Sequence, residues 1–250
     1  MKAWLLAIFL IAPVQEAAAA PTEPLPEQVV LLHGLARSPR AMRPLEKRLS
    51  DEGYAVHNLA YPSRSEPPDV LVRYLQLSLK ECCLESKEPL HFVTHSLGGV
   101  LARAVLAEHR PEALGRVVMI APPNKGSELV DTFGDDWWFR LFLGPTAEAL
   151  GTGKASFPRS IGPPDYELGI IAGAHPLSSR MGSWILTGEN DGVVSIESAR
   201  VEGMTDFLSV PTGHVRIRDD DEVADEVIHF LRVGHFEHGE QSQMTNGQRP

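Results

Sequence analysis

The residue in this sequence best placed for covalent chemistry is Ser96, in the run Thr94-His95-Ser96-Leu97-Gly98-Gly99. A serine hydroxyl is a weak nucleophile unless a base removes its proton, so its setting matters more than its presence. Leu90–Val93 predicts a strand leading into Ser96, and a helix is predicted directly after it. A sharp strand-to-helix turn would hold the hydroxyl above a sheet edge and point the Leu97 N–H toward a developing oxyanion. We therefore predict that Ser96 is a nucleophile; the alternative is a serine that caps the helix.

The same run resembles the nucleophile elbow of the α/β-hydrolases, whose pattern is Gly-x-Ser-x-Gly. The match has one departure, because Thr94 occupies the first position, where a small residue packs beneath the turn. The resemblance implies a triad whose members follow the order serine, acid, histidine along the chain. It also implies an enzyme that needs no metal and no organic cofactor.

A second motif of this resemblance, His33-Gly34-Leu35, follows the first predicted strand, Val29–Leu32. In the family, the residue after His-Gly supplies one backbone N–H of the oxyanion hole, so the resemblance assigns that role to Leu35, alongside Leu97. We expect His33 to brace this loop by hydrogen bonding; its use as the catalytic base is the alternative. Loss of one oxyanion-hole donor typically lowers turnover about 100- to 1000-fold.

The acid and the base that this order requires are found at Asp191 and His214. Asp191 follows a predicted strand over 184–187, and His214 follows one over 207–210. The carboxylate would hold the imidazole in the correct tautomer while the ring takes up and returns the proton. The weaker candidates for these two roles are Glu189, Asp165, His91, His95 and His175.

Two expectations concern neighbours of the triad. His95 adjoins the nucleophile and should point away from it. Asp219–Asp221 come after His214, in the wrong order for the triad acid, and should be the N-terminal acids of the last helix.

The pairing of His33-Gly34-Leu35 with the run 122–127, Pro-Pro-Asn-Lys-Gly-Ser, is most similar to the lipase and esterase branch, which includes PGAP1-like proteins and bacterial lipases. The resemblance implies cleavage of carboxylic esters through an acyl-enzyme on Ser96, with a small-molecule or lipid ester as substrate. A thioesterase, an amidase or an acyltransferase with the same triad stays open. So does a catalytically silent binding protein on the same fold.

Strand and helix patterns alternate along most of the chain. Predicted strands cover 29–32, 54–59, 90–94, 117–120, 184–187 and 207–210, and predicted helices cover 39–49, 69–84, 98–109 and 220–233. Such alternation predicts an α/β fold, here the α/β-hydrolase fold: a mostly parallel sheet with helices on both faces and an inserted cap. The carboxyl ends of parallel strands lie along one edge, so the candidate residues are expected to meet there.

Between Pro122 and Met181 the alternation stops, in a stretch rich in glycine, proline and aromatic residues. We interpret about 123–182 as a cap or lid inserted above the catalytic edge. Its aromatic side chains would form an apolar wall for an acyl chain and a transient contact with a lipid surface, or simply the core of a small cap. The candidate substrate-binding residues are Trp137, Trp138, Phe139 and Phe142.

Both ends of the chain differ in composition from the rest. Met1-Lys2, the apolar run Ala3–Val14 and the small residues Ala17–Ala20 are typical of a cleaved secretory signal, which we assign to residues 1–20. The alternative is an uncleaved anchor or a misassigned start codon. We therefore expect a secreted or periplasmic protein with a hydrolase domain over 21–234 and a polar, disordered tail over 235–250.

Composition excludes other classes of function. The formal net charge of -10 over 250 residues argues against a nucleic-acid partner, which would need clustered basic residues, and it suggests no anionic substrate. The two cysteines, Cys82 and Cys83, are adjacent, so they bridge only with strain and lack the spacing of metal ligands. We expect two thiols on a helix, with no structural disulfide and no metal site.

Overall fold

The computed structural model describes residues 25–134, 136, 144, 146–175, 185–186 and 188–238. Within these residues a six-stranded sheet has the order β2-β1-β3-β4-β5-β6, and all neighbouring strands are parallel. The strands are β1 (Gln28–Leu32), β2 (Ala55–Leu59), β3 (Leu90–His95), β4 (Leu114–Ile120), β5 (Leu168–Gly173) and β6 (Asp206–Val210). The predicted α/β fold with a parallel sheet is confirmed.

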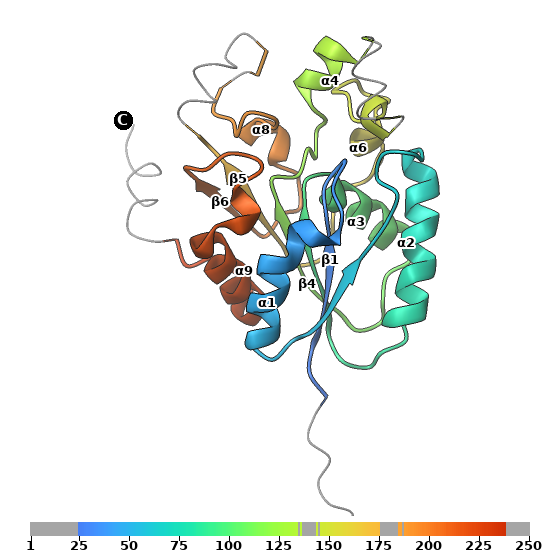
Figure 1. Ribbon diagram of the computed structural model, residues 1–250, viewed down its shortest axis with the longest axis vertical. Coiled ribbons are helices and arrows are strands. Elements are labelled where there is room, and N and C mark those ends of the chain that lie inside the picture. Colours follow the sequence, from blue (N-terminus) through green and yellow to red (C-terminus); the bar gives the residue numbers. More distant parts are fainter. Residues whose placement is uncertain are drawn as a thin grey trace, which may run out of the picture.

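Helices cover both faces of this sheet (Figure 1). One face carries η1 (Pro39–Met42), α1 (Arg43–Asp51) and α9 (Asp221–Val233), and the other carries α2 (Pro68–Cys82) and α3 (Leu97–Glu108). The shorter helices α4 (Glu128–Phe133), α6 (Phe157–Ser160) and α8 (Ile196–Ala199) lie at the top of the view, on the side toward which β1 runs. A last short helix, η2 (Ile217–Asp219), precedes α9.

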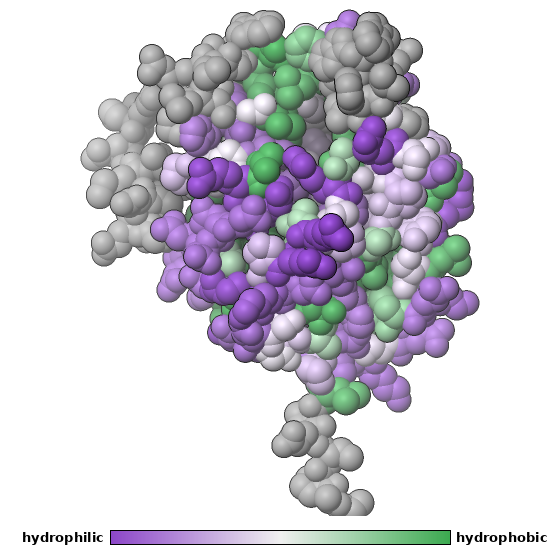
Figure 2. Space-filling model, viewed as in Figure 1, coloured by the Kyte–Doolittle hydropathy of each residue, from purple (hydrophilic) through white to green (hydrophobic). Residues whose placement is uncertain are grey.

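The core consists of two apolar layers, because successive side chains of each strand point to opposite faces. In β1, Val29 and Leu31 pack under α1 and α9, whereas Val30 and Leu32 pack under α2 and α3. Burial of this kind stabilises the fold by roughly 25 cal/mol per Å² of apolar surface. The outward face of α1 and α9 is mostly hydrophilic (Figure 2), as their amphipathic sequences require.

Strand β5 corrects the predicted boundary of the insert. Leu168–Gly173 lies inside the stretch assigned to the cap, yet it is fully buried between β4 and β6. Residues 185 and 186, placed in a predicted strand over 184–187, form a turn and a bend. The fifth strand was missed because its sequence, LGIIAG, contains two glycines and follows a proline-rich stretch. The insert between sheet elements therefore ends before Leu168.

Two further expectations need correction. Cys82 and Cys83 are joined by a disulfide, not left as two thiols. The packed chain also continues past the predicted boundary at 234, because Phe236 is buried with its ring 4.9 Å from that of Phe230. The predicted signal over 1–20 and the tail from 239 lie outside the described residues. No helix in the described part of the chain is long and apolar enough to cross a membrane.

Candidate active site

Three side chains from distant parts of the chain form one hydrogen-bonded series. The ring of His214 donates from Nδ1 to Asp191 Oδ2 over 2.7 Å. Its Nε2 lies 3.0 Å from Ser96 Oγ, where it can accept the hydroxyl proton. The structure thus brings together the three residues named from the sequence, in the geometry that lets a base take a proton from serine.

Ser96 sits in a backbone conformation that only tight local packing maintains. It has φ 54° and ψ −124°, in the region that favours glycine, and it directly follows β3 and precedes α3. A residue held there typically costs about 1–3 kcal/mol, and such strain persists where the surroundings impose it. Here the Ser96 N–H donates to Ile120 O over 2.8 Å, which fixes the turn against β4.

Two glycines let neighbouring segments approach this turn. A Cβ on Gly98 would lie 2.5 Å from the carbonyl oxygen of Leu32, so only glycine allows α3 to start so close to the end of β1. A Cβ on Gly34 would lie 2.9 Å from His95 Nδ1 and 3.1 Å from Ser96 Cβ. The loop after β1 therefore lies directly against the turn at Ser96, the candidate nucleophile turn.

The two candidate oxyanion-hole donors, the N–H groups of Leu97 and Leu35, lie on either side of this contact. Leu97 is the first residue of α3, so its N–H is one of the helix N–H groups that lack an intrahelical partner. Leu35 follows Gly34 in the neighbouring loop. Within the described part of the chain, neither N–H donates a hydrogen bond to the protein. Leu35 and Leu97 therefore stay candidates for the oxyanion hole.

Backbone contacts hold Asp191 and His214 together. Asp191 Oδ1 accepts from the N–H groups of Val193 and Val194 over 2.9 and 2.7 Å, which leaves Oδ2 for His214. The His214 N–H also donates to Asp191 O over 3.0 Å. Asp191 lies at the end of β5, because a Cβ on Gly173 would meet its side chain at 2.7 Å. Asp191 comes well after the end of β5 along the chain, and not directly after a strand over 184–187 as the sequence suggested.

His95 is a site residue whose role the sequence did not reveal. It points away from Ser96, as expected, but its Nε2 donates to His214 O over 2.9 Å and so supports the loop that carries His214. Burial, and after it the electrostatic effect of nearby His214, lowers the pKa of His95 well below its usual value. The ring is therefore neutral, with one N–H to donate. In the sequence, only its position next to Ser96 could have indicated this role.

His33 supports the loop after β1, in agreement with the bracing interpretation. Its ring stacks on Tyr61 with centroids 4.2 Å apart, and its Nδ1 contacts Gly34 O at 2.9 Å. The Tyr61 hydroxyl in turn donates to His33 O. Burial lowers the pKa of His33, so this ring is also neutral.

Of the remaining sequence candidates, Glu189 and His175 lie beside the Asp191 loop without joining the hydrogen-bonded series, since the Ile196 N–H donates to Glu189 O and the His175 N–H donates to Asn190 O. The other two lie away from the series. His91 contacts Glu27, and Asp165 pairs with Arg110. Asp220 caps α9 by accepting from the N–H groups of its first turn, as expected for the acids after His214. The aromatic candidates Trp137, Trp138, Phe139 and Phe142 lie outside the described residues.

The segment 122–127, which follows β4, bridges α3 and α8 by hydrogen bonds. Arg103 of α3 donates to Asn124 Oδ1 over 3.0 Å, and Asn124 Nδ2 donates to Ala199 O over 2.7 Å. Both side chains are buried, so these bonds replace water that the groups have lost. The segment thus fixes the region beside the acid loop rather than contributing to the triad.

Comparisons with known proteins agree with the fold. The profile of one protein family, described as the alpha/beta hydrolase family, matches residues 29–226. No curated protein compared with the chain matches it.

Solved structures similar to the chain include bacterial and archaeal enzymes. The mature form of a Bacillus licheniformis lipase is 20% identical with a TM-score of 0.63, over 88% of this chain and 96% of that one. A metagenomic carboxyl esterase is 16% identical with a TM-score of 0.62, over 82% and 69%. A Pyrococcus furiosus esterase is 21% identical with a TM-score of 0.56, over 82% and 81%. At these identities the likeness establishes the fold alone.

Proposed function

Because the chain belongs to the alpha/beta hydrolase family, we propose that it is a serine hydrolase that cleaves carboxylic esters. Ser96 is the nucleophile, His214 the general base and acid, and Asp191 the residue that orients His214. The observation that carries this proposal is the hydrogen-bonded series from Asp191 Oδ2 through the His214 ring to Ser96 Oγ.

Acylation uses both nitrogens of His214. As Ser96 Oγ forms a bond to the ester carbonyl carbon, its proton moves to Nε2, and the imidazolium is stabilised by the Asp191 carboxylate. The carbonyl oxygen gains negative charge and accepts hydrogen bonds from the N–H groups of Leu35 and Leu97. The bond to the alcohol oxygen then breaks, and Nε2 returns the proton to that oxygen. The alcohol leaves and an acyl-Ser96 ester remains.

Deacylation repeats these steps with water. His214 takes a proton from water as its oxygen attacks the acyl carbon, and it then protonates Ser96 Oγ as the acid is released. The three side chains, the N–H groups of Leu35 and Leu97, and water complete the cycle without net change in the enzyme.

The test compares Ser96→Ala with Ser50→Ala, which removes an exposed hydroxyl from α1. With a p-nitrophenyl ester, we expect Ser96→Ala to lower kcat by at least about 1000-fold, because the nucleophile is lost. Ser50→Ala should retain full activity. A fluorophosphonate probe should label the parent chain and Ser50→Ala but not Ser96→Ala. Full esterase activity in Ser96→Ala would overturn the proposal.

Substrate comparisons and product analysis distinguish ester hydrolysis from the alternative activities of the same triad. Hydrolysis of a thioester or an amide at a higher kcat/KM than the matching oxygen ester would change the substrate class. Formation of a new ester when an alcohol acceptor is added would indicate acyl transfer. A chain that binds esters but neither turns them over nor reacts with fluorophosphonate would be a binding protein on this fold.

The acyl chain is proposed to lie against the aromatic run 137–142. Activity on p-nitrophenyl esters of increasing chain length should then rise toward long chains, and it should rise further when the substrate forms a lipid surface. A preference for short chains would instead make these residues part of a plain cap.

We also propose that the chain is exported, on the basis of residues 1–20. Export should leave a mature protein that starts after the apolar run. N-terminal sequencing of protein from the culture medium or periplasm checks this. Retention of Met1 in the cytoplasm would overturn it.

A further inference from the structure

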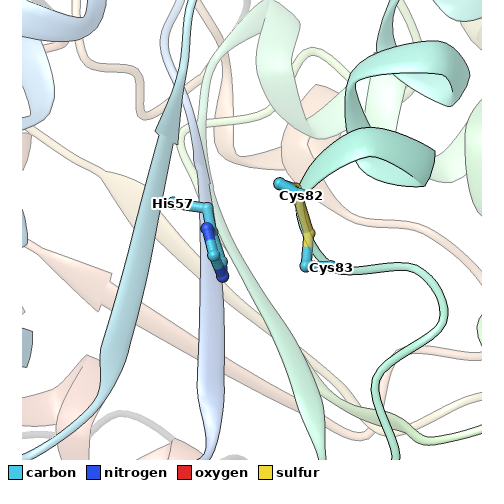
Figure 3. Close-up of side chains that lie close together, drawn as sticks. All are labelled: His57, Cys82 and Cys83. Atoms are coloured by element: carbon cyan, nitrogen blue, oxygen red, sulfur yellow. A yellow bond between two sulfur atoms is a disulfide. The ribbon is translucent and has the colours of Figure 1, made fainter.

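Away from the triad, three side chains with metal-binding atoms lie close together (Figure 3). His57 comes from β2, Cys82 is the last residue of α2, and Cys83 follows it directly. One ligand atom from each lies within 4.8 Å of the other two. The two sulfur atoms are joined in a disulfide in this structure.

His57 has the surroundings of a metal-binding histidine. Its Nε2 lies 2.8 Å from Gln28 Oε1, and an amide oxygen only accepts, so Nε2 carries the proton and Nδ1 carries the lone pair. Gln28 Nε2 donates in turn to Ser86 Oγ, which holds the amide in place. Metal-binding histidines typically have such a partner on their other nitrogen.

The group lies apart from the triad. Gln28 is the first residue of β1. His57 lies in the middle of the edge strand β2, where it pairs with Val30 of β1. Ser96, in contrast, follows the carboxyl end of β3. A ligand at His57 would therefore not contact the proposed catalytic residues, and its binding can be measured without substrate.

The donor set indicates which ion would fit. Two thiolates and one imidazole suit thiophilic ions such as Zn²⁺. Tetrahedral zinc with bonds of about 2.3 Å to sulfur and about 2.0–2.1 Å to nitrogen places its ligand atoms less than about 4 Å apart. The three ligand atoms here lie within 4.8 Å of one another, so once the disulfide is reduced the two cysteine side chains must move to bring them into that range. Water would supply the fourth ligand.

Disulfide sulfurs do not provide thiolates, so the redox state of the pair would control binding. A dithiol reductant supplies two electrons and two protons, which break the S–S bond and give two thiols while the reductant becomes a disulfide. Metal binding then releases the two thiol protons. Cys82 is the more exposed of the pair and is the sulfur a reductant would reach first.

We propose that Cys82, Cys83 and His57 form a metal site that binds a thiophilic divalent cation when the cysteines are reduced and loses it when they form the disulfide. Spacing along the chain gave no sign of this site, because adjacent cysteines alone supply too few ligands. The third ligand comes from a strand that the fold places beside the end of α2.

The test uses Co²⁺ as the probe, because cobalt–thiolate coordination gives charge-transfer absorption and intense visible bands when tetrahedral. The chain has two cysteines, so a thiol count reports on this pair alone. We expect the reduced protein to bind one equivalent of Co²⁺ with these bands, Zn²⁺ to displace it, and protein oxidised to the disulfide to show none. Equal binding in both redox states, or no thiolate bands after complete reduction, would overturn the proposal.

Three variants distinguish this site from adventitious binding, with circular dichroism confirming that each is folded. His57→Ala should lose the tetrahedral bands, whereas His109→Ala, which removes an exposed histidine, should keep them. Gln28→Ala should weaken Co²⁺ binding about 10- to 100-fold, because it removes the partner that orients His57. Unchanged affinity in folded His57→Ala would show that the imidazole is not a ligand and would overturn the three-residue site.

Discussion

His95 is buried between the nucleophile turn and the loop that carries His214, with 2% of its surface exposed. Its Nε2–H donates to the backbone oxygen of His214, so it acts on the proposed base through the main chain. This makes His95 a positioning residue: it touches no reacting atom, but it limits the movement of the ring that must reach Ser96.

We expect His95→Ala to lower kcat about tenfold with little change in KM. A hydrogen bond of this kind is typically worth about 0.5–1.5 kcal/mol, and its loss frees the His214 loop. His95→Gln retains an N–H donor and should recover much of the rate. Steady-state kinetics on a p-nitrophenyl ester measures both variants. If His95→Ala loses stability but keeps its kcat, the residue is structural only.

At the scale of elements, the nucleophile turn depends on how closely α3 approaches β1. Gly98 is in the first turn of α3, and a Cβ there would meet the Leu32 and His33 carbonyl oxygens at 2.5 and 2.8 Å. Backbone atoms cannot rotate away as a side chain can, so the whole start of the helix would have to move. The position of Ser96 would move with it.

Gly98→Ala should therefore lower the free energy of unfolding by roughly 1–3 kcal/mol, the usual cost of overpacking, and reduce activity further than stability alone explains. Gly153→Ala is the matched control, because nothing lies within 4 Å of a Cβ there. Urea denaturation gives the stabilities, and fluorophosphonate labelling reports the nucleophile. Equal stabilities for both variants would contradict the close contact.

The elements predictable from the sequence are those with strong periodicity. The pattern from β1 through β4 was predicted to within a few residues because apolar runs and helical spacing agree with the turns between them. β5 was not, because a buried strand with two glycines has no alternation to detect. Asp191 was identified from its local motif, but its route to the end of β5 depends on contacts that no local pattern encodes. The same holds for His95, whose partner is 119 residues away.

Considered as a whole molecule, the candidate site exists only when the fold is complete. The contact from His214 to Ser96 spans 118 residues, and the one to Asp191 spans 23. Conditions that loosen the sheet therefore act on activity as well as on stability. Buried histidines make acid one such condition.

Burial lowers the pKa of four histidines in the described part of the chain: His33, His57, His91 and His95. Unfolded, each takes up a proton near pH 6.5, whereas in the folded protein it does so only at a lower pH. The unfolded state thus binds more protons as the pH falls below about 6.5, and stability declines there. The carboxyls with lowered pKa, Asp165 and Glu197, add to this loss only below about pH 4.5.

We therefore expect the free energy of unfolding to be level between about pH 7 and 9 and to fall between pH 6.5 and 5. Each histidine that stays neutral when folded contributes at most about 1.4 kcal/mol per pH unit to that slope. Urea denaturation at several pH values measures it. His91→Gln removes one buried ring, which faces Glu27 and Arg116, and should flatten the slope, while the exposed His109→Gln should not. Parallel pH profiles for parent and His91→Gln would show that this histidine takes up its proton equally in both states.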